Sequence, residues 1–206
     1  MTQSYTKNSD IASLITSRIC HDLVNPLGAI NNGLELMELS GTPMSEEYML
    51  LCDSVKNANA RVNFFRVAFG PAHSQAMSSA QVHTLVEDMF LSGRCRVKLN
   101  ITGEHPREQI KMLFLIIQCC ENALPRGGDI SAAHMDGKWR VRARGARIQR
   151  VNTLWDHLEM GADSDISAAD IHFAIAREYL EYTGAQLAVE FHETEVSILL
   201  TESIPS

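Results

Sequence analysis

The chain has 206 residues, 45% apolar and 21% charged, which fits a medium domain or a helical module with a small α/β domain and excludes a disordered protein. Its net charge of −7 is a poor match for a phosphate backbone, so nucleic-acid binding is not expected. There is no apolar run of 18 residues, no signal-peptide core and no CxxC pair among five cysteines, so we expect a cytoplasmic protein without a membrane segment, disulfide framework or zinc site.

The first long pattern predicts a helix over residues 10–39, with Asp10 as its N-cap. Apolar residues at steps of three and four form one stripe along it: Ile15, Ile19, Leu23, Leu27, Ile30, Leu34 and Met37. About 30 residues of helix span roughly 45 Å. A helix of that length would protrude from a small domain unless it packed along another helix.

A second helix is predicted over residues 44–68. Gly41 can end the first helix, Thr42 can cap the second, and Pro43 suits its first turn. The second helix has its own stripe: Met49, Cys52, Val55, Asn59, Val62, Phe65 and Phe69. Two helices bury little core by themselves, so we expect the hairpin, residues 1–72, to pair with a second copy in a dimeric four-helix bundle.

From residue 73 to 206 helices and strands alternate. The predicted elements are a helix over 80–91, a strand over 96–102, a helix from Pro106 to before Pro125, strands over 129–135 and 138–143 joined by an Asp136–Gly137 turn, a helix over 148–160, a helix from a Ser167–Asp170 capping box to Tyr182, and strands over 186–192 and 195–201. This order predicts a two-layer α/β sandwich with helices on one face, and an α+β chain overall.

Chemistry is concentrated in the segment Cys20–Leu27, in the middle of the first predicted helix. His21 lies off the apolar stripe, with Arg18 and Asn25 on the same face one turn to each side. A neutral imidazole nitrogen is a good nucleophile at neutral pH and can form phosphohistidine. The neighbouring Asp22 can hold the other ring nitrogen, and an amide such as Asn25 can orient a phosphate oxygen or a water.

A lone histidine such as His21 is more often a solvated residue on a helix surface. Pro26 cannot donate the backbone hydrogen bond that would reach the carbonyl of Asp22, so a bend or loosened turn is expected just after the histidine. A mid-helix proline can cost about 3 kcal/mol, and its place beside a histidine and a carboxylate favours a functional reason for keeping it.

The sequence HDLVNPL at residues 21–27 resembles the H-box of dimeric histidine kinases, in which a phosphorylated histidine is followed by an acidic residue and then Pro-Leu. The hairpin and the later element order resemble that family's dimerisation and ATP-binding domains, and Glu121–Ala123 stands where its asparagine box would fall. The family's two glycine-rich loops are missing, since residues 144–148 read RGARI and residues 165–170 read DISAAD. The chain is therefore similar to the ChpT-type histidine phosphotransferases, which combine an H-box with a degenerate ATPase-like domain.

That resemblance implies a role in a bacterial phosphorelay. His21 would accept a phosphoryl group from the receiver Asp of a hybrid kinase and pass it to a response-regulator Asp, without binding ATP. Asp22 and Asn25 would assist, no cofactor or metal would be bound, and Mg²⁺ would belong to the partner's receiver domain. A turn near residue 42 places His21 opposite about Asn63, so the receiver docking site is expected at three residues: Arg18, Asn63 and Arg66.

Other functions remain open for the same residues. Asn25 could orient a water for a response-regulator phosphatase. An active histidine kinase is disfavoured by the missing glycine loops. A pseudo-kinase adaptor that binds receivers without carrying phosphate is disfavoured by His21 itself, because an adaptor needs no nucleophile there.

Overall fold

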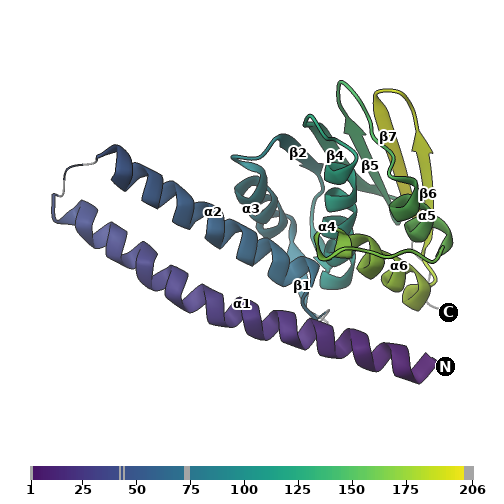
Figure 1. Cartoon of the computed structure of the whole chain (residues 1–206), viewed down its shortest axis with the longest axis horizontal. Coiled ribbons are helices and arrows are strands. Elements are labelled where there is room, and N and C mark those ends of the chain that lie inside the picture. Colours follow the sequence, from purple (N-terminus) through teal and green to yellow (C-terminus); the bar gives the residue numbers. More distant parts are fainter. Residues whose placement is uncertain (1, 42, 44, 72–74, 202–206) are drawn as a thin grey trace. The chain divides into compact units, whose positions relative to one another are not determined.

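A computed structural model describes residues 2–41, 43, 45–71 and 75–201, with side chains from residue 12 onward. The helices are α1 (Thr2–Leu39), α2 (Glu46–Ala68), α3 (Ser79–Phe90), α4 (Arg107–Asn122), α5 (Asn152–Met160) and α6 (Ile171–Thr183); the strands are β1 (Ala76–Ser78), β2 (Cys95–Asn100), β3 (Glu104–Pro106), β4 (Gly128–Met135), β5 (Lys138–Arg144), β6 (Gln186–Phe191) and β7 (Glu195–Thr201) (Figure 1). The chain forms two compact units, Met1–His73 and Ser74–Ser206, which confirms the expected α+β class.

The first unit is the expected pair of helices, but α1 is longer than its pattern predicted. It begins at Thr2, so the prediction that Asp10 caps it was wrong. The polar residues before Asp10 include neither proline nor glycine, and nothing there stops a helix. The helix also continues without a break through Pro26.

The second helix starts two residues after the predicted residue 44, at Glu46. Ser45 is its N-cap, and the Ser45 hydroxyl accepts a hydrogen bond of 3.3 Å from the backbone N–H of Tyr48. Pro43 precedes the helix and does not lie in its first turn, while Thr42, the predicted cap, falls outside the described residues.

The hairpin is held near its turn by a small cluster of buried side chains: Leu34, Tyr48 and Val55, with Cys52 packed against them. The Tyr48 hydroxyl donates a hydrogen bond of 2.6 Å to the carbonyl oxygen of Leu34, which joins the two helices directly. A buried hydroxyl with a partner avoids the penalty of an unsatisfied polar group.

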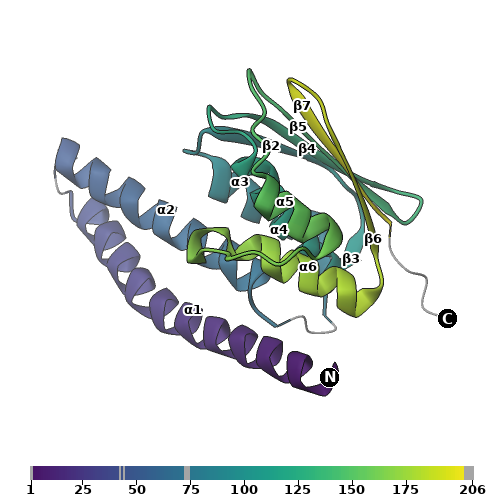
Figure 2. The same cartoon turned by 45° about the vertical axis from the view of Figure 1, so that its right-hand side comes forward.

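The second unit is built on a five-stranded mixed sheet in the order β2-β4-β5-β7-β6. β2 runs parallel to β4, and the other neighbouring strands are antiparallel. Helices α3 to α6 cover one face of the sheet, as the sequence predicted (Figure 2). The largest fully buried side chains of this core are aromatic: Trp139, Trp155, Phe114 and Phe173.

Two details of the second unit differ from expectation. The segment before the first predicted helix of this unit contains β1, which pairs antiparallel with β3, and β3 includes Pro106, where a helix was expected to begin. Strands of three residues are too short to show a period of two. The predicted capping box at Ser167 is instead a 3-10 turn over Ala168–Asp170, in which the Ser167 hydroxyl donates to the Asp170 carboxylate at 2.7 Å.

The remaining predicted elements occur, with the helix expected over 148–160 beginning at Asn152. The capping box of this unit lies at Ser78 and Gln81, at the start of α3. Within the described ranges, none of the helices has the length and apolar character needed to cross a membrane.

Candidate functional site

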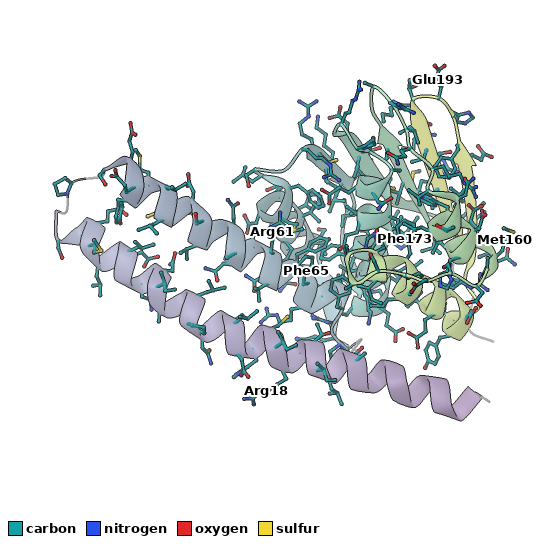
Figure 3. The ribbon with its side chains drawn as sticks, viewed as in Figure 1. Arg18, Arg61, Phe65, Met160, Phe173 and Glu193 are labelled. Atoms are coloured by element: carbon teal, nitrogen blue, oxygen red, sulfur yellow. The ribbon has the colours of Figure 1, made fainter. Side chains whose placement is uncertain are left out.

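His21 and Asp22 lie side by side on the exposed flank of α1. Their side chains are 69% and 50% exposed, and His21 Nδ1 lies 3.3 Å from Asp22 Oδ1. Arg18, one turn earlier, donates from Nε to Asp22 Oδ2 at 2.9 Å. Figure 3 shows Arg18 on the side of α1 that points away from α2. The Asp22 carboxylate therefore bridges the guanidinium and the imidazole.

This arrangement selects the reactive ring nitrogen of His21. The pKa of the Asp22 carboxyl lies below its ordinary value, chiefly because of the hydrogen bond with His21 and then because of Arg18. An ionised carboxylate can only accept, so Nδ1 of a neutral His21 carries the proton and Nε2 carries the lone pair. Nε2 makes no hydrogen bond to any described residue. Nε2 is thus unengaged, on a side chain that is largely exposed.

The opposite side of α1 packs on α2. Cys20, Leu27 and Leu34 recur every seven residues, and Cys20 and Leu34 are only 5% and 9% exposed. A second series at the same spacing is 44–50% exposed: Leu23, Ile30 and Met37. The apolar residues that were predicted as one stripe of α1 therefore form two faces, and α2 covers only one of them. The burial of Cys20 was missed, although its seven-residue spacing from Leu27 is a signal for it.

Of the two docking residues predicted on α2, Arg66 lies near the histidine segment of α1, whereas Asn63 makes no hydrogen bond to His21. Burial raises the pKa of the Cys20 thiol, and the positive charge of Arg66 acts in the opposite direction, so Arg66 lies close to the residue before His21. Asn63 is half-buried and, among the described residues, makes no hydrogen bond to His21. Asn25 is exposed on the turn after His21 and likewise has no hydrogen bond to its ring.

In the second unit, the asparagine expected to be a remnant of a nucleotide site has an internal partner. Asn122 Nδ2 donates to Asp170 Oδ1 at 3.1 Å, and the Ser167 hydroxyl donates to the other oxygen of the same carboxylate at 2.7 Å. This ties the end of α4 to the turn before α6, across 48 residues of sequence. The NH₂ group of Asn122 is thus engaged within the chain, whereas its buried Oδ1 has no hydrogen-bond partner among the described residues.

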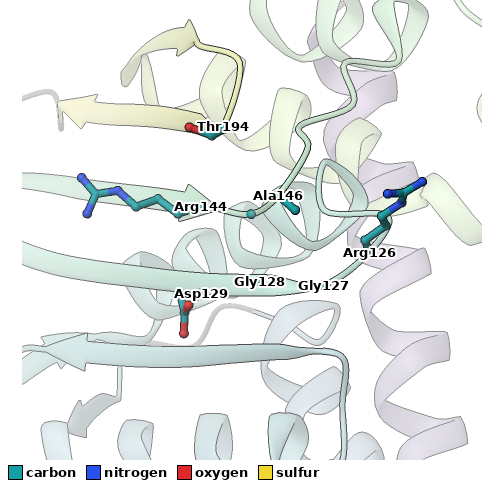
Figure 4. Close-up of a pocket in the computed structure, with 8 residues that line it drawn as sticks. Arg126, Gly127, Gly128, Asp129, Arg144, Ala146 and Thr194 are labelled. Atoms are coloured by element: carbon teal, nitrogen blue, oxygen red, sulfur yellow. The ribbon is translucent and has the colours of Figure 1, made fainter.

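A depression of about 500 Å³ lies where two glycine-containing loops meet beside β4 and β5 (Figure 4). It is lined by Arg126, Gly127, Gly128, Asp129, Arg144, Gly145, Ala146 and Thr194. The backbone N–H groups of its three glycines donate to the carbonyls of Leu124, Arg94 and Thr194, at 3.0, 3.3 and 3.1 Å. Phosphate-binding loops need such N–H groups free, so these three amides do not form a phosphate cradle.

Comparison with known proteins identifies the family. Residues 79–195 match the family described as histidine phosphotransferase C-terminal domain. The chain is also 32% identical to protein phosphotransferase ChpT of Brucella abortus strain 2308, over 93% of this chain and 94% of that protein. The chain belongs to the histidine phosphotransferase family.

A solved structure of a phosphotransferase also resembles this chain. A bacterial phosphotransferase is similar with a TM-score of 0.68 and 27% identity, covering 93% of this chain and 95% of that one. The Acinetobacter baumannii histidine kinase AdeS matches more weakly, with a TM-score of 0.45 and 13% identity over 90% of this chain and 98% of that one.

The match to the histidine phosphotransferase family and the matches to whole proteins cover different parts of the chain. The family match lies entirely in the second unit and does not reach His21. The longer matches leave out only 7% of the chain, so they include the helical unit that carries His21. The family assignment supports a phosphotransferase that serves a phosphorelay, and the role of each residue rests on the geometry above.

Proposed function

We propose that this histidine phosphotransferase carries a phosphoryl group on Nε2 of His21. It would accept the group from the receiver Asp of a hybrid kinase and pass it to the Asp of a response regulator. The observation that carries the proposal is the bridge from Arg18 through Asp22 to Nδ1 of His21, which leaves Nε2 free on an exposed helix flank.

The chemistry follows from that geometry. The Nε2 lone pair attacks the phosphorus of the receiver's acyl phosphate, the bond from phosphorus to the aspartyl oxygen breaks, and the carboxylate leaves. Nδ1 keeps its proton throughout, and Asp22 offsets the positive charge that develops on the ring. In the second transfer the acceptor carboxylate attacks phosphorus and the P–N bond breaks. Asn25 is proposed to orient a phosphoryl oxygen during both transfers.

The phosphoryl donor is proposed to be another protein and not ATP. An acyl phosphate is already activated, so the transfer requires no nucleotide. The hydrogen bond between Asn122 and Asp170 and the internally bonded glycine amides support a second unit that does not bind ATP. We expect no cofactor on this chain, and Mg²⁺ on the partner receiver domain. Partners of this kind would place the reaction in the cytoplasm.

The proposed active form is a homodimer. Within one chain, α2 leaves several large apolar side chains of α1 about half exposed, including Ile19 at 54%, Leu23 at 46% and Ile30 at 50%. Burying apolar surface is the main favourable contribution to association. Pairing this face with a second copy would complete a four-helix bundle. Receiver docking is proposed around His21 on residues from both helices: Arg18, Asn63 and Arg66.

The test uses acid-labile radiolabelled phosphate. The full chain is incubated with labelled ATP alone, and separately with a cognate receiver domain labelled on its Asp. We expect label from the receiver alone, on the wild type and on the control His192→Ala, which changes another exposed histidine, and none on His21→Ala. Label from ATP alone would mean that the chain is a kinase.

Two further outcomes separate the remaining alternatives. Rapid loss of phosphate from the receiver without stable label, abolished by Asn25→Ala, would indicate a phosphatase. Receiver binding without label on any variant would indicate an adaptor.

A further inference from the structure

The face of the five-stranded sheet opposite its helices carries an ordered set of exposed cations. β5 alternates strictly between buried and exposed residues, and its exposed side chains are all basic. β2, two strands away, adds two more exposed basic residues. We call this set the basic sheet face: Arg96, Lys98, Lys138, Arg140, Arg142 and Arg144. It gathers six positive charges on one surface of a chain whose net charge is −7.

At one end of this face the charges are neutralised within the chain. Arg96, Asp129, Arg144 and Glu195 occupy neighbouring positions on four adjacent strands, with alternating sign. Arg96 Nε lies 2.9 Å from Asp129, and Arg144 is paired with Glu195. Interactions with these arginines lower the pKa of both carboxyls.

The next positions along the strands lack such partners. Lys98 and Arg142 flank Ser131, and Arg140 lies between Ala133 and Leu199. Over the described stretches, four cations of the face form no ion pair with a carboxylate: Lys98, Lys138, Arg140 and Arg142.

The residues directly opposite these four cations on the neighbouring strands are uncharged. Arg140 and Arg142 are two residues apart on one strand, about 7 Å along it, where like charges repel. A carboxylate between them would remove that repulsion and could bind a guanidinium in a bidentate manner. We propose that the basic sheet face binds an acidic segment of a partner protein. This proposal is independent of the phosphorylation of His21.

The surroundings favour a protein segment over a nucleic acid. The exposed positions of this face contain no Phe, Tyr or Trp on which bases could stack, among the strand residues described. Two ion-paired carboxylates and Glu190 border the cations, so the positive surface is too short for a continuous phosphate backbone. A protein segment can place carboxylates over Arg140 and Arg142 and apolar atoms over Leu199. The positive and negative side chains at the edge of the face then fix the position of the bound segment along the strands.

The test measures binding of a fluorescently labelled Glu- and Asp-rich peptide to the full chain by anisotropy, at low and at physiological salt. The variant is Arg140→Gln/Arg142→Gln, which removes two exposed charges and breaks no ion pair between described residues. The matched control is Lys56→Gln/Arg61→Gln, the same charge change on the exposed side of α2.

We expect the peptide to bind the wild type, the control and His21→Ala with equal affinity, more weakly as salt rises. We expect the dissociation constant to increase by about tenfold or more in Arg140→Gln/Arg142→Gln, because two charge-assisted contacts are lost. Equal binding to that variant and to the control, or no binding to the wild type, would overturn the proposal. So would tighter binding of duplex DNA or of vesicles containing phosphatidylglycerol to the same two arginines.

Discussion

Asp22 contacts both Arg18 and His21, and these two contacts decide which nitrogen of the histidine is available. All three side chains are largely exposed, so the ion pair adds little to the stability of the fold. Its consequence is local. An anionic neighbour favours the tautomer with its proton on Nδ1, and the lone pair is then on Nε2.

Replacing Asp22 by Asn is expected to slow phosphorylation of His21. The amide keeps the size of the side chain but loses the charge, and its NH₂ group can donate to Nδ1 and so favour the wrong tautomer. Loss of an orienting partner of this kind typically lowers activity by about 10- to 100-fold. The initial rate of label transfer from a phosphorylated receiver measures the effect, with Asp53→Asn, another exposed carboxylate, as control. An unchanged rate in Asp22→Asn would show that the carboxylate does not select the tautomer.

His172 predicts a pH dependence of stability. Burial lowers its pKa from 6.5 to about 4, so the folded state keeps it neutral where the unfolded state binds a proton. Stability from this group is complete above pH 6.5 and is lost as the pH falls towards 4, by on the order of 3 kcal/mol in total.

Urea unfolding between pH 7 and pH 4 tests this dependence. As the pH is lowered, the free energy of unfolding should decrease more steeply for the wild type than for His172→Gln. The variant His192→Gln, which changes an exposed histidine, should keep the wild-type slope. Equal slopes for all three proteins would exclude His172 as the titrating group.

At the scale of elements, α1 has two apolar faces and one polar flank. The series that includes Cys20 and Leu34 packs on α2, the series that includes Leu23 and Ile30 is left half exposed, and His21 belongs to the flank. A helix with two apolar faces is typical of bundles, in which each helix contacts two neighbours. The same helix can therefore hold the hairpin together and expose His21 to solvent.

Tyr48→Phe is expected to weaken the hairpin. The hydroxyl of Tyr48 is the donor of the 2.6 Å hydrogen bond to the carbonyl of Leu34, and its removal should lower the free energy of unfolding by about 1 kcal/mol. Denaturant unfolding measures the loss. Tyr182→Phe, whose ring is 73% exposed, should leave stability close to that of the wild type. If both variants unfolded at the same denaturant concentration, this hydrogen bond would not stabilise the hairpin.

At the scale of the whole molecule, the chain joins a helical unit that carries His21 to an α/β unit by which the family is recognised. In the second unit, the Asp170 carboxylate accepts a hydrogen bond from the NH₂ group of Asn122, and backbone carbonyls accept from the N–H groups of three glycines.

The proposed dimer can be tested by substituting charged residues into its proposed interface. Leu23→Glu/Ile30→Glu would place carboxylates in an apolar contact and should convert a wild-type dimer to a monomer. Size-exclusion chromatography with light scattering measures the mass. The control Leu91→Glu/Met160→Glu changes side chains that are 84% and 68% exposed in the second unit, and it should remain dimeric. A monomeric wild type, or a dimeric Leu23→Glu/Ile30→Glu variant, would contradict the four-helix bundle.

The kinds of element, their order and the histidine segment of α1 could be predicted from the amino-acid sequence. Helical and strand periodicities depend on residues a few positions apart, so they are legible in the chain, and the H-box resemblance led to the family that the comparisons show. Boundaries were less accurate, as at Thr2 and Ser45, because several nearby residues can start or cap a helix.

Features that join residues far apart in sequence became clear from the fold alone. It set the strand order, the pairing of β1 with β3, the hydrogen bond between Asn122 and Asp170, and the rows of charge that the basic sheet face forms across β2 and β5. It also divided the single apolar stripe of α1 into a buried and an exposed face. The physical reason is that periodicity records which side of an element is apolar, whereas its partner is chosen by packing of the whole chain.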